Sequence, residues 1–340
     1  MQFGLNLPTH GVMSRDVDGD CFLTNIDPQD MKPVERSVRA EELGYHSVWL
    51  SDHIVTERQT DEVHPANSSG KRAYPDRPVM LDVATTFGAI ASRTSTLRFC
   101  PTVYIAPYRH PLVTAHEWAT LDVLSGGRAM MAVGVGWETG EFAALGANFD
   151  QRGGVLWESI QIYRQAWEHS DIEFRGKYFD IDGVSMDLKP IQSRIPIWYG
   201  GMSKIAAKRA ARLCDGFYPM LLDGRTQPSD LDFLRTVIRK EADELQRDLS
   251  DFTMGAYCQV RLTTTAQPDG SFRYGRPVLT GNVEQIVGDL ERLAGHGYQH
   301  ITVQFDCPGG TVTEYAEQTE QFALEVLPQV SSIAAAPMTS

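Results

Sequence analysis

Along the chain, an amphipathic helical stretch repeatedly ends near a glycine and is followed at once by a short apolar stretch. This pattern occurs at 41–50, 211–218 and 293–303. Glycine can adopt the left-handed conformation that stops a helix, and the chain can then enter the next strand directly. The pattern therefore predicts alternating helices and strands, although the copies share little sequence identity.

Eight apolar stretches have the length and composition of strands, at roughly 3–7, 46–51, 96–103, 129–135, 196–200, 216–221, 254–262 and 300–305. Between them, four stretches place apolar residues on one helical face. These faces are Val79, Val83, Phe87 and Ile90; Leu156, Ile160, Tyr163 and Trp167; Leu231, Leu234, Ile238 and Leu245; and Val283, Ile286, Val287 and Leu290. Asn282 and Gln285 predict a capping box before the last of them. Alternating strands and helices form a parallel sheet, and eight strands favour an α/β fold closed into a (β/α)8 TIM barrel over an open sheet.

Three longer connections interrupt this rhythm. Residues 8–30 and 54–78 are polar and follow the first and second strands, so they are expected to leave the C-terminal face of the barrel as lids. Residues 172–181 predict a small hairpin inserted before the fifth strand. We expect one domain over residues 1–330 and a frayed tail at 331–340.

Composition narrows the class of protein. Of 340 residues, 42% are hydrophobic and 22% charged, and the net charge is −13, which disfavours a nucleic-acid-binding surface. The five cysteines are widely spaced, without a CxxC motif, so neither a disulfide framework nor a zinc site is expected. Residues 1–25 lack the pattern of a secretory signal, and no apolar run reaches the length of a membrane span. We therefore expect a cytoplasmic protein that binds neither nucleic acid nor membranes.

A glycine turn after the fifth strand is the first candidate for chemistry. Gly200, Gly201, Met202 and Ser203 lead from an apolar strand into an alanine-rich helix. Backbone N–H groups at a helix start attract an anion, and glycines let a phosphate approach closely. The alternative is an ordinary glycine turn with Ser203 as the N-cap.

The second candidate is Ser51-Asp52-His53 at the end of the second strand. In a barrel, the carboxyl ends of the strands carry catalytic residues. His53 could exchange a proton near neutral pH, and Asp52 could orient it or bind the edge of a cofactor. The alternative is a hydrogen-bonded core histidine or a helix cap.

The segment 134–140 contains a GxG motif but lacks the third glycine and the acidic residue of a dinucleotide site. As the end of the fourth strand, it would place Trp137 and Glu138 over the barrel mouth, with Trp137 as a pocket wall or a hydrophobic plug. No GxxxxGK[ST], HExxH or GxSxG motif occurs, and the histidines lack metal-ligand spacing, so no metal is expected. A phosphate site without a nucleotide-binding loop suggests a mononucleotide-like cofactor across the top of the barrel.

At these residues the chain resembles the bacterial luciferase-like superfamily of flavin- and deazaflavin-dependent oxidoreductases. The resemblance covers nearly the whole chain and is carried by residues 40–53, 108–111, 120–128, 134–137, 195–201, 210–212 and 215–216. It implies a (β/α)8 barrel, usually dimeric, that binds reduced FMN or coenzyme F420.

The resemblance also implies roles for single residues. Ser51-Asp52-His53 is similar to the Ser-Asp-His of the deazaflavin subgroup, in which the histidine is the proton partner. Thr102-Val103 falls where many members hold a non-proline cis peptide that backs the cofactor ring. The implied cofactor-binding residues are Asp52, Thr102, Val103, Gly136, Gly200, Gly201, Met202 and Ser203, and the expected pocket residues are Tyr104, Trp137, Glu138 and Tyr218. Some deazaflavin dehydrogenases have a glutamate directly after the strand-4 glycine, but here Trp137 intervenes, so the acid role is not carried over to Glu138. No sugar-phosphate pocket matches either, so a sugar-phosphate dehydrogenase is not implied.

Three functions remain open from the sequence. The first is hydride transfer between coenzyme F420 and a small organic substrate, with His53 as the catalytic proton partner. The second is an FMN-dependent monooxygenase that uses oxygen and reduced flavin. A separate reductase would supply the reduced flavin. The third is a non-catalytic flavin-binding protein. A homodimer is expected in each case from the resemblance.

Overall fold

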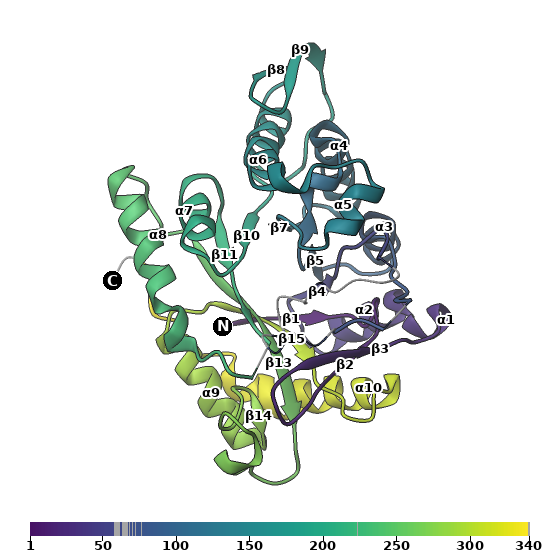
Figure 1. Ribbon diagram of the computed structural model, residues 1–340, viewed down its shortest axis with the longest axis vertical. Helices are drawn as coiled ribbons and strands as arrows, with labels where there is room; N and C mark the ends of the chain where they lie inside the picture. Colours follow the sequence, from purple (N-terminus) through teal and green to yellow (C-terminus); the bar gives the residue numbers. More distant parts are fainter. Residues whose placement is uncertain are drawn as a thin grey trace.

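A barrel of parallel strands lies at the centre of the computed structural model (Figure 1). The structure describes residues 1–57, 62, 67, 69, 71, 73–75, 77–222 and 224–338. All eight predicted strands are present. They are β1 (Gln2–Asn6), β4 (Ser47–Leu50), β5 with β6 (Arg98–Pro101 and Tyr104–Ile105), β7 (Met131–Gly134), β10 (Ile197–Gly200), β11 (Gly216–Tyr218), β13 (Thr253–Leu262) and β15 (His300–Phe305). Two short strands, β12 (Met220–Leu221) and β14 (Thr280–Gly281), pair with β13.

The order of the strands brings the sheet back to its starting point. Neighbours follow the path β5-β4-β1-β15-β13-β11-β10-β7-β6, and each of these pairs is parallel. The path begins at β5 and ends at β6, which are two halves of one continuous segment, 98–105. The sheet is therefore nearly closed, and the predicted TIM barrel is confirmed.

Helices follow the strands and surround the barrel (Figure 1). They are α1 (Pro28–Met31), α2 (Pro33–Glu42), α3 (Val83–Ala91), α4 (Pro111–Ser125), α5 (Thr139–Ala144), α6 (Arg152–Glu168), α7 (Lys204–Leu213), α8 (Asp232–Glu244), α9 (Val283–Gly295), α10 (Val312–Gln321) and α11 (Leu327–Val330). The predicted capping box of Asn282 and Gln285 is confirmed at the start of α9. The helix predicted from Val79 begins later, because the side chain of Asp82 caps the first turn by accepting from Thr85 N.

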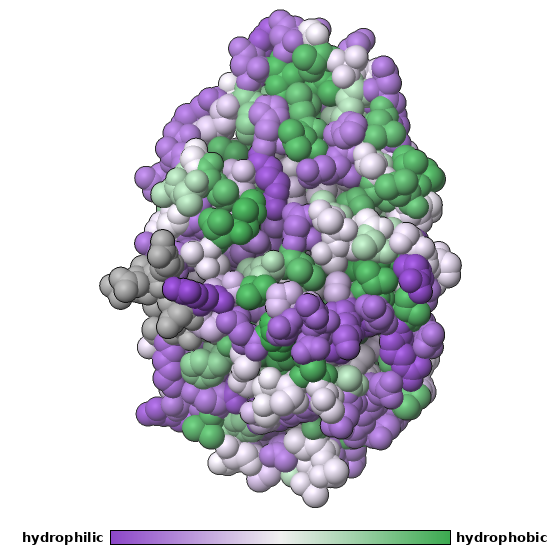
Figure 2. Space-filling view, turned by 90° about the vertical axis from the view of Figure 1, so that its right-hand side faces the viewer, coloured by the Kyte–Doolittle hydropathy of each residue, from purple (hydrophilic) through white to green (hydrophobic). Residues whose placement is uncertain are grey.

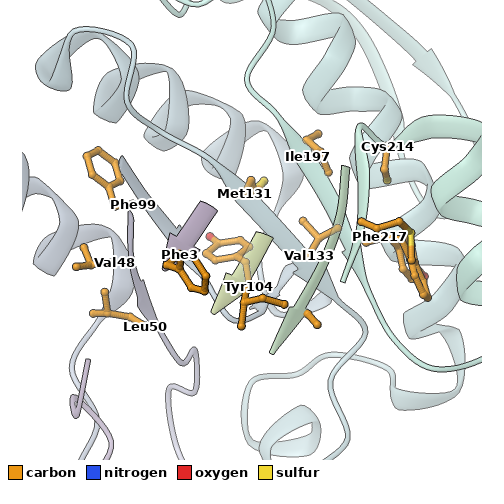
Figure 3. Packing of buried hydrophobic residues seen from close by; sticks show 14 of the residues in the cluster. Phe3, Val48, Leu50, Phe99, Tyr104, Met131, Val133, Ile197, Cys214 and Phe217 are labelled. Atoms are coloured by element: carbon orange, nitrogen blue, oxygen red, sulfur yellow. The ribbon is translucent and has the colours of Figure 1, made fainter. Parts of the chain in front are cut away.

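The two faces of each strand serve different cores. Val48 and Leu50 of β4 pack in the layer between the sheet and the helices, as do Met131 and Val133 of β7 (Figure 3). The residue between each pair, Trp49 in β4 and Ala132 in β7, belongs to a second cluster. Successive side chains of a strand point to opposite faces, so this second cluster fills the inside of the barrel.

Aromatic side chains close the lower part of the barrel interior. Trp49 stacks on Tyr218 with ring centroids 4.8 Å apart, and Trp198 lies 5.7 Å from Trp49. His300 packs edge-on against Trp198 at 5.1 Å. All four side chains are buried, so this part of the interior is a packed core.

The three predicted insertions differ in the secondary structure that they contain. Within the first lid, 8–30, residues Val12–Arg15 (β2) and Cys21–Thr24 (β3) form an antiparallel hairpin, a local structure that its polar composition did not predict. The second hairpin is confirmed as Asp171–Arg175 (β8) paired with Asp180–Ser185 (β9). Of the second lid, 54–78, residues 58–61, 63–66, 68, 70, 72 and 76 lie outside the described residues.

The end of the chain contacts the barrel. Ala336 N donates a hydrogen bond to Ala294 O, and the Met338 side chain is buried. Residues 339 and 340 of the predicted tail lie outside the described residues. The division of the chain at residue 330 stays a prediction.

The surface mixes residue types. On the face shown in Figure 2, hydrophilic and hydrophobic residues are interspersed. Within the described ranges, none of the helices combines the length and apolar character that crossing a membrane requires.

One buried arginine ties the third strand to its neighbouring helices. Arg128 donates to the carbonyls of Ser125, Leu97 and Ala91 and to Thr94 Oγ1, at 2.7–2.8 Å. We expect Arg128→Met to lower the free energy of unfolding by about 3 kcal/mol, because buried carbonyls lose their donors. Urea denaturation measures this, with Arg93→Met at an exposed position just after α3 as the control, for which a change within about 0.5 kcal/mol is expected.

Candidate functional site

A cavity of about 420 Å³ opens at the carboxyl ends of the strands. This volume lies in the range of small-molecule sites. Ten of the predicted site residues line it: Asp52, His53, Thr102, Val103, Gly136, Trp137, Gly200, Gly201, Met202 and Tyr218. Residues separated by 150 positions in the sequence thus share one wall, as the barrel topology requires.

His53 is held by a buried carboxylate. Its Nδ1 lies 2.6 Å from Glu141 Oε2, and the Glu141 side chain is fully buried. Tyr108 OH donates to the same oxygen at 2.7 Å, while Ile54 N donates to Oε1 at 2.6 Å. Among the described residues, Nε2 of His53 has no hydrogen-bond partner, and the residue lines the cavity. The arrangement leaves one ring nitrogen of His53 available to a ligand.

The pair shifts the protonation of both partners. Burial opposes a charge on His53, but the hydrogen bond and the negative charge of Glu141, helped by Asp52 and Glu138, outweigh it and raise the pKa of His53. Burial raises the pKa of the Glu141 carboxyl, but His53 and the hydrogen bonds that Glu141 accepts from its other donors outweigh burial and lower this pKa. Both shifts favour the imidazolium–carboxylate form of the pair.

Asp52 has a different set of partners. Its carboxylate accepts two hydrogen bonds from Arg109 at 2.8 Å and a third from Ile105 N at 2.8 Å. This bidentate pair ties the end of β4 to the segment after β6. Asp52 lies on the cavity wall, but these bonds occupy both of its oxygens, so its proposed contact with a cofactor edge stays a prediction.

The third strand bulges into the cavity at Thr102-Val103. The peptide bond between these residues is cis, as the family resemblance implied. The bulge brings Val103 against two neighbouring strands, where a Cβ on Gly134 or Gly200 would lie 2.3 or 2.6 Å from a methyl group of Val103. The glycines at these strand ends are required by this close approach.

The glycine turn before α7 contains the N-cap of the alternative interpretation, and its binding of a phosphate stays a prediction. Ser203 Oγ accepts from Ala206 N at 3.1 Å, which makes it the N-cap. Gly201 N donates to Tyr218 O. Within the described chain, the N–H groups of Met202, Ser203 and Lys204 have no hydrogen-bond partner. These three groups can still bind an anion, although Ser203 itself does not line the cavity.

Two expected pocket residues lie elsewhere. Tyr104 points out of the barrel, where its ring packs edge-on against Trp118 at 4.5 Å and its hydroxyl lies 3.2 Å from Thr114 Oγ1. The bulge at Thr102-Val103 interrupts the alternation of the strand, and Val103 lines the cavity instead. Glu138 is buried beside the cavity and accepts from Glu57 N.

Sequence reasoning missed several residues of the site. Glu141, Tyr108 and Arg109 hold His53 and Asp52, and His10, Tyr74 and Tyr257 line the cavity. Glu141 lies in the first turn of α5, directly after the GxG segment. Its position after a strand end was a usable signal, but the sequence does not show that it faces His53.

His53, Glu138 and Glu141 also bring ligand atoms within 4.8 Å of one another. The oxygens of Glu141 already accept hydrogen bonds from His53, Tyr108 and Ile54. A metal ion would have to displace these donors. The expectation that the protein uses no metal stays a prediction.

Comparisons with known proteins agree with this geometry. The profile of the luciferase-like monooxygenase family matches residues 1–268. F420-dependent glucose-6-phosphate dehydrogenase of Amycolatopsis mediterranei is 30% identical over 228 residues, which is 66% of this chain and only 62% of that relative's length.

Solved structures show the same fold. An F420-dependent secondary alcohol dehydrogenase aligns over 97% of this chain and 98% of its own, with a TM-score of 0.72 and 19% identity. A long-chain alkane monooxygenase aligns over 97% and 91%, with a TM-score of 0.74 and 16% identity. One neighbour is a deazaflavin enzyme and the other a monooxygenase, so these structures do not distinguish the two cofactors.

Proposed function

The chain belongs to the luciferase-like monooxygenase family, and we propose that it is an oxidoreductase that transfers hydride between coenzyme F420 and a small organic substrate. The observation that carries this proposal is the cavity that is lined together by His53, which is paired with Glu141, by the bulge at Val103 and by the turn at Gly201. The F420-dependent relative at 30% identity supports the choice of cofactor.

The residues of the cavity fit such a cofactor. Val103, Trp137, Tyr218 and Tyr257 provide apolar walls for a flat ring. His10 is buried in the wall, and its Nδ1 has no hydrogen-bond partner within the described chain. Burial lowers the pKa of His10 to about 4, so it is neutral near pH 7 and can exchange a hydrogen bond with a polar ring edge.

Each group then has a distinct role. Val103, with Thr102, Gly136 and Gly200, would back the ring, and the N–H groups of Met202, Ser203 and Lys204 would hold its phosphate. When bound, F420 supplies or accepts the hydride. His53 would give or take the matching proton through Nε2, while Glu141 keeps the imidazole oriented and favours its charged form.

Trp137 and Tyr218 would border the substrate. Both line the cavity, and the ring of Trp137 lies edge-on to His53 at 6.0 Å. This places them beside the proposed proton donor. Their role, the homodimer and the cytoplasmic location stay predictions.

The choice between the cofactors can be tested by binding. We expect the apoprotein to bind F420 at least about tenfold more tightly than FMN, measured by fluorescence titration of each. A spectrum and a mass of any copurifying small molecule give an independent answer. Tight binding of FMN with none of F420 would contradict the proposal and favour the monooxygenase reaction.

A further inference from the structure

A second cavity, of about 440 Å³, is lined by residues of α6, of the turn of the β8–β9 hairpin and of α7. Figure 1 shows where these elements lie in the fold. Ile205, Lys208, Arg209 and Arg212 contribute to it from α7. Their spacing of three, four and seven residues places them on one helical face, and the alanines of the opposite face are buried against the barrel. We call this cavity the α7 groove.

The α7 groove is cationic in a protein whose net charge is −13. Lys177 from the hairpin turn adds a fourth positive charge. Among the residues that line the α7 groove, Glu158 carries the one carboxylate. This carboxylate accepts hydrogen bonds from the hairpin backbone, namely from Lys177 N, Tyr178 N and Phe179 N, at 2.7–3.1 Å. The α7 groove therefore attracts anions against the overall charge of the molecule.

Two of the cations are available for a ligand. Lys208 and Arg212 share the carboxylate of Glu241. Arg209 contacts the Tyr199 hydroxyl at 3.2 Å, and within the described residues neither Arg209 nor Lys177 forms an ion pair with a carboxylate. Trp157, Tyr178 and Ile205 give the α7 groove an apolar floor that suits methylene groups between charges.

The α7 groove and the main cavity have lining residues close together in the chain. Met202 lines the main cavity, and Ile205, three residues later, lines the α7 groove. The N–H groups assigned to the cofactor phosphate belong to residues 202–204, the start of the same short segment. From Ile205 to Arg212 the helix face extends about 10 Å, which accommodates about three residues of an extended chain.

We propose that the α7 groove binds the oligoglutamyl tail of F420, with Lys177 and Arg209 contacting its carboxylates. This inference rests on the proposed function. The inference also makes the proposed function more specific, because FMN ends at its phosphate and has no group to occupy the α7 groove. The tail would follow the phosphate past the start of α7 and place successive carboxylates along the cationic face.

The test compares the affinity of the apoprotein for F420 carrying several glutamates with that for the form carrying none, by fluorescence titration at low and high salt. We expect the glutamylated form to bind about 5- to 20-fold more tightly at low salt, and the preference to shrink as salt screens the exposed charges. In Lys177→Gln/Arg209→Gln the preference should fall to about twofold or less, with affinity for the tail-free form unchanged.

The control Lys32→Gln/Arg93→Gln removes the same charge from exposed positions near α2 and α3 and should keep the full preference. Equal affinity of the wild type for both forms, or a preference that survives in Lys177→Gln/Arg209→Gln, would overturn the role of the α7 groove and leave the proposed function intact. Binding of FMN with neither deazaflavin form bound would reject both.

Discussion

His53→Ala is expected to lower turnover by about 10²- to 10⁴-fold while the dissociation constant of F420 changes by no more than about threefold. A positioned acid or base contributes a factor of this size. The cavity wall loses the ring but keeps Val103, Gly201 and Met202, so cofactor affinity should persist. The measurement is the rate of deazaflavin oxidation or reduction with the most active compound from a panel of alcohols and carbonyl compounds, together with a fluorescence titration of the cofactor.

The loss of turnover in His53→Ala should not come from a disordered Glu141. Without His53, its carboxylate still accepts from Tyr108 OH and Ile54 N. His116→Ala, at an exposed position of α4, is the matched control and should retain wild-type turnover. Unchanged turnover in His53→Ala would reject the proton role, and a loss of affinity alone would make His53 a binding residue.

The barrel could be predicted because its information is local. Apolar strands and amphipathic helices can be recognised within windows of about ten residues. For example, α6 buries Leu156, Ile160, Tyr163 and Trp167, as the helical spacing predicted. The motif-bearing strand ends at His53 and Gly201 also converge as a closed barrel requires. What was predicted is therefore the scaffold and the residues that follow directly from it.

What could not be predicted depends on contacts between distant segments. Glu141 is an ordinary helix glutamate in sequence and becomes part of the site only because α5 places it 2.6 Å from a residue 88 positions earlier. Tyr104 was misplaced for a related reason, since strand alternation does not show the bulge at which Val103 lines the cavity and Tyr104 packs against Trp118. The hairpin in the first lid buries Met13 and Cys21 within a polar stretch, where no regular period indicates a strand.

Glu141→Gln is expected to lower the pKa of His53. In the wild type, burial disfavours the imidazolium, and Glu141 outweighs that effect. Glutamine preserves the shape and the backbone contacts but removes the negative charge, so burial should dominate in the variant. Titration of the His53 ring by NMR measures the change directly and requires no substrate. The carboxylate of Glu138 raises the pKa of His53 less than that of Glu141 does. Glu138→Gln should therefore lower the pKa of His53 by less.

The same substitution should move the pH profile in a direction that a purely structural role would not. In the proton-donating direction, activity requires protonated His53 and is lost as the pH rises through its pKa, so this limb should move to lower pH in Glu141→Gln. Turnover at slightly alkaline pH should fall by about 10- to 100-fold, because the ring also loses its orienting partner. An unshifted limb with uniformly reduced activity would contradict the electrostatic role of Glu141.

Folding stability should follow the same linkage. The stabilisation from His53 is complete below its ordinary pKa of about 6.5 and is lost as the pH rises through its raised pKa, whereas that from Glu141 is lost as the pH falls through its lowered pKa. The pair therefore stabilises the fold most between the ordinary pKa values of the two groups, about 4.3 for a glutamate and about 6.5 for a histidine. In Glu141→Gln this maximum should flatten in denaturation measured across pH, because neither partner then depends on the charge of the other.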